Sequence, residues 1–145
     1  MMEVLIGALS IGIFSFLWAF VSGKLALIAW VGFVGCTSYY AAGKNFRDSL
    51  LTNLTGVFWA MVIITINSHV HFPESLSILI GIFSFVMWYQ SRCKLLAFIP
   101  GTFLGACSTF GTEGNYKMVL ICLICGAIIG YLSDKCGQLV IKKCS

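Results

Sequence analysis

The chain repeats itself with a period of about seventy residues, and this constrains its fold more than any other feature. The sequence Gly-Ile-Phe-Ser-Phe occurs at 12–16 and again at 81–85, which is 69 residues later. After one inserted residue the identities continue at an offset of 70: Lys24 and Lys94, Phe33 and Phe103, Gly35 and Gly105, Ser38 and Ser108, Asn45 and Asn115, Gly56 and Gly126. A constant offset over successive segments indicates a duplicated unit rather than chance matching of apolar residues.

The composition places the chain in a membrane. Hydrophobic residues make up 59% of the sequence and charged residues only 10%, with a mean hydropathy of +0.98. Soluble domains carry about 25% charged residues. A single globule of 145 residues cannot bury so many apolar side chains, so the excess must face lipid. The sequence therefore predicts an all-α, polytopic membrane protein, because helices satisfy their own backbone groups inside a bilayer.

Charged residues divide the chain into apolar stretches that predict six transmembrane helices. A helix that crosses the hydrocarbon core needs about 20 residues. The fourth and fifth stretches hold only sixteen residues each, so a single tilted or broken hairpin is an alternative for these two. The six stretches are 4–22, 25–43, 50–67, 75–90, 95–110 and 118–133.

The basic residues predict the orientation of these helices. Six spans place both termini on one side, and seven lysine and arginine residues fall on that side against two on the other. Because basic loops stay in the cytoplasm, both termini are predicted to be cytoplasmic. The basic residues on the side of the termini are Lys44, Arg47, Arg92, Lys94, Lys135, Lys142 and Lys143, and those opposite are Lys24 and Lys117.

Repeat and topology together predict two inverted three-helix repeats in a single membrane domain, 1–145. Repeat 1 covers 4–67, repeat 2 covers 75–133, and 134–145 forms a cytoplasmic tail. Each repeat contains an odd number of spans, so the second must enter the membrane upside down relative to the first. Inverted repeats are a recurrent plan of transporters, with the substrate site near the bilayer midplane.

The Gly-rich middle helices of the two repeats, within 30–40 and 98–110, are the predicted site. Pro100 and Gly101 are expected to break the second of them and to free backbone groups. The alternative is that the glycines only let helices pack closely. The candidate pore-lining or solute-binding residues are Phe33, Gly35, Thr37, Ser38, Tyr40, Pro100, Gly101, Phe103, Gly105, Ser108, Thr109 and Phe110.

The predicted spans contain no Asp, Glu, Lys, Arg or His. Active transporters normally carry an ionisable group at membrane depth. We therefore expect a passive channel or facilitator for a small neutral solute or a weak acid, working as a homo-oligomer because so short a chain encloses little interior. The alternative function is a non-transporting scaffold that recruits a partner through its basic cytoplasmic tail.

The sequence indicates neither an enzyme nor a cofactor or metal site. It contains no Ser–His–carboxylate set, no paired carboxylates within a span and no phosphate-binding loop. His69 and His71 have i,i+2 spacing in a loop, which favours an ordinary interfacial segment over a metal site. All seven cysteines are predicted to lie within spans or on the cytoplasmic side, where no disulfide framework is expected. No basic patch suited to nucleic acid is present.

Three ordered motifs carry a resemblance to a known family. They are WVGFVGCTSYYA at 30–41, GVFWAMVII at 56–64 and IPGTFLGACSTFG at 99–111. The chain resembles the uncharacterised bacterial inner-membrane proteins typified by YcdZ and YahC of enterobacteria, over nearly its whole length. The resemblance implies a small protein of the bacterial cytoplasmic membrane and no established substrate. The His-containing loop at 69–74 departs from it.

Overall fold

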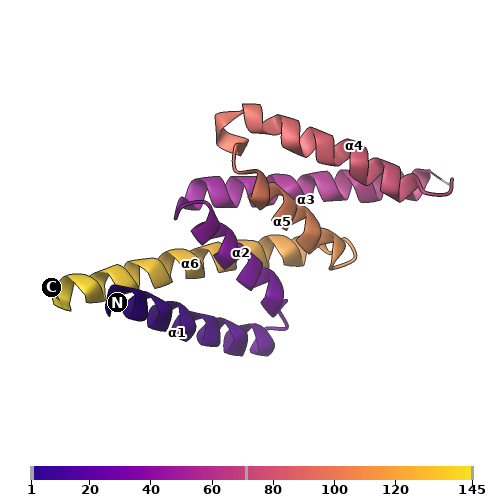
Figure 1. The fold of residues 1–145 in the computed structure, drawn as a ribbon. Coiled ribbons are helices and arrows are strands. Elements are labelled where there is room, and N and C mark those ends of the chain that lie inside the picture. The colour runs from indigo at the N-terminus through magenta and orange to yellow at the C-terminus, as the bar shows by residue number, and fades with distance from the viewer. Residues whose placement is uncertain (1, 71, 145) are drawn as a thin grey trace.

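The computed structural model describes residues 2–70 and 72–144, and within these ranges it is entirely helical (Figure 1). Its α-helices are α1 (Met2–Lys24), α2 (Ala29–Ala41), α3 (Phe46–His69), α4 (Ser75–Tyr89), α5 (Ile99–Phe110) and α6 (Tyr116–Cys144). Two short 3₁₀ turns, Gln90–Arg92 and Lys94–Leu96, connect α4 to α5. The predicted all-α class is thus confirmed for the described part of the chain.

The four longer helices lie side by side in the order α1, α6, α3, α4, and the two short helices cross them (Figure 1). The first short helix, α2, packs mainly against α6, and the second, α5, packs mainly against α3. Each short helix therefore lies against a long helix from the other half of the sequence. The two halves of the chain are interlocked rather than separate.

Three of the helices are long and apolar enough to cross a membrane, namely α1, α3 and α6. The other helices are shorter, with 15 residues in α4, 13 in α2 and 12 in α5. At 1.5 Å per residue, α2 and α5 are only about 20 Å and about 18 Å long. A hydrocarbon core of about 30 Å exceeds both lengths.

The chain folds into shorter middle helices than the apolar stretches suggest because turns lie inside those stretches. Ala26 has a left-handed backbone with φ of 51°, in the connection between α1 and α2. Contrary to the expected mid-helix break, Pro100 lies in the first turn of α5. The first turn needs no backbone N–H donor, so proline is accommodated there. Pro100 thus begins a short helix instead of interrupting a longer one.

The helix backbones meet at glycines, and the same contacts recur 70 residues apart. A Cβ atom on Gly35 of α2 would collide with the Leu123 carbonyl of α6, and one on Gly105 of α5 would collide with the Asn53 carbonyl of α3. Likewise, a Cβ on Gly126 would meet the backbone of α2 and one on Gly56 would meet the backbone of α5. Small residues allow this close approach of helices in membranes.

The turns that follow α2 and α5 also match. Residues 43–44 and 113–114 all adopt left-handed backbones, with φ between 54° and 82°. Asn45 and Asn115 then accept a hydrogen bond from the backbone N–H three residues later, at 3.2 Å and 3.4 Å. This is the usual capping bond at a helix N-terminus. The repeat in the sequence thus corresponds to a repeat in local structure.

Replacing Gly56 or Gly126 by alanine should destabilise the protein by about 2 kcal/mol or more, because the added methyl group forces two helix backbones apart. Gly12 and Gly81, the first residues of the repeated pentapeptide, are the matched controls, since a Cβ on either meets nothing within 4 Å. Alanine at these two positions should change stability by less than about 1 kcal/mol. Thermal unfolding of the purified protein in detergent measures both effects, and equal losses at all four positions would contradict the packing assignment.

Candidate functional site

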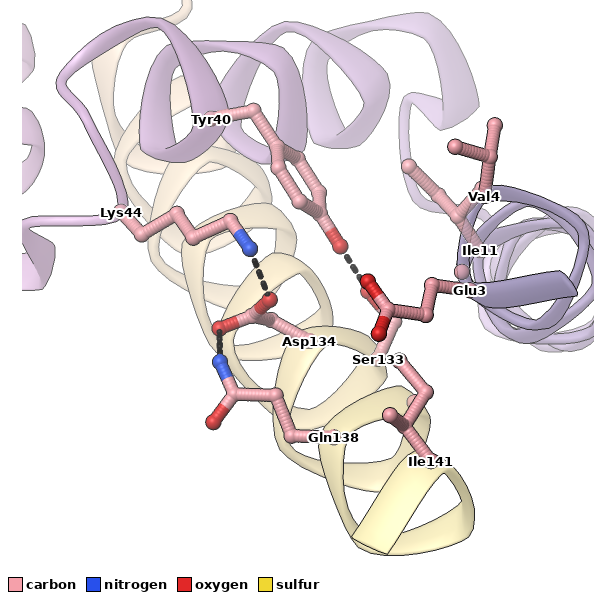
Figure 2. A pocket seen from close by; sticks show the side chains of 11 residues that line it. Glu3, Val4, Ile11, Tyr40, Lys44, Ser133, Asp134, Gln138 and Ile141 are labelled. Atoms are coloured by element: carbon pink, nitrogen blue, oxygen red, sulfur yellow. Dashed lines mark hydrogen bonds and ion pairs between the residues drawn. The ribbon is translucent and has the colours of Figure 1, made fainter. Parts of the chain in front are cut away.

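A cavity of about 400 Å³ lies between α1, the α2–α3 turn and the C-terminal part of α6 (Figure 2). Its apolar wall includes Val4, Ile11 and Ile141. Its polar lining, unusual in a chain this apolar, consists of Glu3, Tyr40, Lys44, Ser133, Asp134 and Gln138. Two carboxylates and one ammonium group give this lining a net charge of −1.

Asp134 of α6 is the central charged group of the cavity. Its Oδ1 atom accepts a hydrogen bond from Lys44 Nζ at 2.6 Å, which also forms an ion pair. Its Oδ2 atom accepts from Gln138 Nε2 at 2.8 Å and from the Tyr39 hydroxyl at 3.4 Å. The Asp134 side chain is only 8% exposed, whereas the Lys44 side chain is 51% exposed. A buried anion is therefore neutralised by a side chain that is half exposed at the surface.

Lys44 reaches Asp134 from the turn between α2 and α3. Its left-handed backbone, with φ of 65°, belongs to the turn that ends α2. The hydrogen bond to Asp134 raises the pKa of Lys44 above its ordinary value. A raised lysine pKa means that the ammonium form persists throughout the neutral range, so Lys44 is positively charged under physiological conditions.

Hydroxyl groups shape the wall beside this ion pair. Ser133 Oγ donates to the Gly130 carbonyl at 3.0 Å, and it lies 2.8 Å from the Tyr40 hydroxyl. Because the serine proton is used within α6, Tyr40 is the donor in the second bond. Ser10 Oγ of α1 donates to the Ser133 carbonyl at 2.7 Å and holds α1 against α6.

A second polar group lies fully buried between α2 and α3. Ser49 Oγ donates to Ser38 Oγ at 2.9 Å, and Ser38 Oγ donates to Asn53 Oδ1 at 3.1 Å. The Asn53 Nδ2 atom is buried and has no hydrogen-bond partner in the described part of the chain. Such an unpaired buried donor costs about 1–3 kcal/mol. The Asn53 side chain therefore bridges α2 and α3 through Oδ1, while its Nδ2 atom has no partner among the described residues.

The twelve residues singled out from the sequence do not form one surface. Tyr40 alone of them lines the cavity, and Ser38 belongs to the buried polar group. The three glycines lie in helix contacts, with a Cβ on Gly101 meeting Thr52 and the ring of Phe98. Ser108 and Thr109 are buried and donate to carbonyls of their own helix at 2.8 Å and 2.9 Å.

The remaining predicted residues lie toward the outside. Phe103 and Phe110 are partly buried and pack against the cluster of Ala60, Met87 and Ala106. Phe33, Thr37 and Pro100 are exposed. None of these five residues lines the cavity.

Sequence reasoning missed the Lys44–Asp134 pair because it used charges only as markers of span ends. The predicted sixth span stopped at residue 133 and assigned Asp134 to a tail, but α6 continues through Cys144. One signal was present in the sequence. Gly126, Gly130, Asp134 and Gln138 recur every four residues, which places them on one helix face. A Cβ on Gly130 would lie 3.0 Å from the Tyr39 ring, so this face is the one that meets α2.

The repeat brings a different pair together at the equivalent position of the other half. At the offset of 70, Lys44 is equivalent to Gly114, and Asp134 is equivalent to Ile64. Gly114 and Ile64 also meet, since a Cβ on Gly114 would lie 3.3 Å from Ile64 Cδ1. The fold thus accommodates an apolar contact at the position where the first half has an ion pair.

Comparison with known proteins shows which family the chain belongs to. Residues 8–138 match the model of a family described as protein of unknown function (DUF1097). The chain belongs to this family. No solved structure matches it significantly.

Its relatives include proteins of the bacterial inner membrane. The chain is 43% identical to the inner membrane protein YcdZ of Escherichia coli K12 over 135 residues, which are 90% of this chain and 83% of that protein. It is 40% identical to YcdZ of Salmonella typhimurium LT2, over 90% of this chain and 84% of that protein. It is 31% identical to the uncharacterised protein YahC of Escherichia coli K12, over 89% of this chain and 87% of that protein. The resemblance seen in the sequence is therefore confirmed.

No cluster of three His, Cys, Asp or Glu side chains suited to a metal ion occurs among the residues that the structure describes. His69, at the end of α3, bonds within its own helix. His71 lies outside the described residues.

A double-mutant cycle tests the ion pair. Lys44→Met should destabilise the protein by about 1–3 kcal/mol, because it leaves the buried Asp134 carboxylate without a counter-charge. Asp134→Asn should cost less, since the amide keeps partners and Lys44 can turn to solvent. The double variant should be more stable than the sum of the two losses predicts. Thermal unfolding in detergent gives the coupling, and strict additivity would show that the pair contributes nothing.

Proposed function

We propose that this inner-membrane protein is a passive facilitator for a small polar solute. The observation that carries the proposal is the cavity at one end of the helix array, because it places hydroxyl, carboxylate and ammonium groups beside an apolar wall. A volume of about 400 Å³ is within the range of small-molecule sites. We propose no catalytic role, cofactor or nucleic-acid partner for these groups.

The proposed architecture is six membrane-embedded helices arranged as two inverted three-helix repeats. Its support is the recurrence of glycine contacts, turns and caps at an offset of 70. On this proposal α2 and α5 enter the membrane as short helices beside the long ones, as discontinuous helices do in transporters. The excess of basic residues in the loops and tail on the side of the two termini supports a cytoplasmic position for both.

The proposed route leads from the cavity toward Ser38, Ser49 and Asn53. These neutral groups lie on α2 and α3, and Ser38 is two residues from Tyr40 in the cavity wall. Neutral hydrogen-bonding groups suit an uncharged solute, and nothing along this route replaces the hydration of a bare ion. The negative lining of the cavity disfavours an anion, so a weak acid would pass in its neutral form only.

The other predicted lining residues have two proposed roles. The glycines hold the helices together, as their contacts with facing carbonyls support. The exposed Phe33, Thr37 and Pro100 lie where a second copy of the chain would cover them in a homo-oligomer. Large apolar surfaces on α1 and α4 are exposed to lipid or to such a copy.

Filling the cavity should stop the flux. Gly7 lines the cavity and Gly12 does not, although both lie on α1 and a Cβ on either meets nothing within 4 Å. In proteoliposomes under osmotic gradients of water, glycerol, urea, acetamide, formate and acetate, Gly7→Phe should slow the permeating solute at least about fivefold. Gly12→Phe should leave its rate unchanged.

A flat response of the folded, oriented wild-type protein to every solute would reject the facilitator. It would favour the scaffold alternative. Lys142→Gln with Lys143→Gln tests that alternative better than a tail deletion, because Gly137, Gln138 and Ile141 of the same helix segment line the cavity. Equal slowing by both phenylalanine variants would place the route elsewhere.

A further inference from the structure

We propose that the cavity binds the ammonium group of a small primary amine, and that the Lys44 side chain occupies this position when no amine is bound. This proposal concerns a ligand of the cavity and not the neutral solute that is proposed to pass along the route above. Binding itself does not require that the protein transports anything, so the two proposals can fail separately.

The first step of the argument is that Asp134 is a fixed anion with one replaceable partner. Two of its hydrogen bonds come from Gln138 and Tyr39, whose side chains arise from packed helices and both bind Oδ2. Its Oδ1 atom has only Lys44 as a partner among the described residues. A carboxylate buried to this degree requires a cation, because an unpaired buried charge is strongly unfavourable.

The second step is that Lys44 can leave. Its side chain is half exposed, its backbone lies in a turn, and the bond to Asp134 is the only side-chain hydrogen bond described for its ammonium group. The four-carbon stem is flexible and reaches water easily. An alkylammonium ion carries the same charge and the same three N–H donors as the Lys44 ammonium. It can therefore replace Lys44 without leaving Asp134 unpaired.

The third step is that the rest of the cavity suits an amine better than other ions. Glu3 contributes a second carboxylate, and Lys44 is the only basic residue of the lining, so the net charge stays at −1. The Tyr40 hydroxyl retains lone pairs that can accept an N–H donor. Figure 2 shows Glu3, Tyr40, Lys44 and Asp134 around the same space. Val4, Ile11 and Ile141 offer an apolar wall to the alkyl part of the amine.

The fourth step is the comparison with the other half of the repeat. The Gly114–Ile64 contact has the same position in its half and contains no charge. The second half closes this position without a charge, so the repeated backbone arrangement does not by itself call for an ion pair there. The carboxylate at Asp134 instead gives one end of the molecule an affinity for cations.

Chemical rescue tests this site. Lys44→Ala removes the tethered ammonium, so the purified full-length variant in detergent should unfold at a lower temperature than the wild type. Ethylammonium chloride should raise the unfolding temperature of Lys44→Ala by about 3 °C or more at saturation, and by less in the wild type, where Lys44 competes. Tetramethylammonium chloride at the same ionic strength is the control, because it has the charge but no N–H donor.

The double variant Lys44→Ala with Asp134→Asn should show no difference between the two salts. Equal stabilisation of Lys44→Ala by both salts, or an undiminished ethylammonium effect in the double variant, would overturn the proposal. Should Lys44→Ala fail to fold, calorimetric titration of the wild type with ethylammonium decides. Binding weakened about tenfold or more by Asp134→Asn supports the site, and unchanged or undetectable binding overturns it.

Flux measurements separate this proposal from the preceding one. Binding of ethylammonium that depends on Asp134, without flux of any solute, would leave the amine site intact and reject the facilitator. Flux of urea or glycerol without amine binding would reject the amine site and leave the facilitator intact.

Discussion

The rest of the structure depends on the contact of helix backbones at four glycines. Gly35 and Gly126 bring α2 against α6, and Gly56 and Gly105 bring α3 against α5. Because each contact joins a glycine to a facing backbone, it leaves no room for a solute between these helices. The contact between α6 and α2 changes along α6. At Gly126 the two backbones meet, and at Gly130 the backbone of α6 lies against the ring of Tyr39. At Asp134 the carboxylate accepts a hydrogen bond from the Tyr39 hydroxyl. The cavity opens where backbone contact has given way to contacts between polar side chains.

The repeat was the part of the sequence from which most structure could be predicted. Its offset of 70 predicted which residues are equivalent, and equivalent residues do share contacts, turns and caps. The lengths of the middle helices were less predictable. The length of an apolar stretch indicates how many residues can face lipid, but it does not reveal a turn that is built from apolar residues. The left-handed Ala26 is such a turn, since alanine gives none of the signals that glycine or proline would give there.

The candidate site was harder to predict because it depends on departures from the repeat. Hydropathy treats Lys44 and Asp134 as ends of spans, yet they lie 90 residues apart in sequence and form an ion pair. Nothing in the spacing of two isolated charges predicts that pairing without the packing of α2 on α6. Their equivalents, Gly114 and Ile64, show that the backbone arrangement tolerates either chemistry. Features shared by the two halves therefore explain the fold, and features that differ between them point to function.

Two further polar departures from the repeat lie on α3. Ser49 and Asn53 correspond to Val119 and Leu123 in the second half. Both form hydrogen bonds with Ser38 of α2. Ser38, Ser49 and Asn53 therefore form a buried polar group, whereas the second half has apolar residues at two of the three equivalent positions. A membrane protein that needed only stability would gain by burying Val and Leu in both halves, as an unpaired Asn53 amide is a cost. The route proposed for a hydrogen-bonding solute would account for that cost, because the solute would accept a hydrogen bond from the free amide.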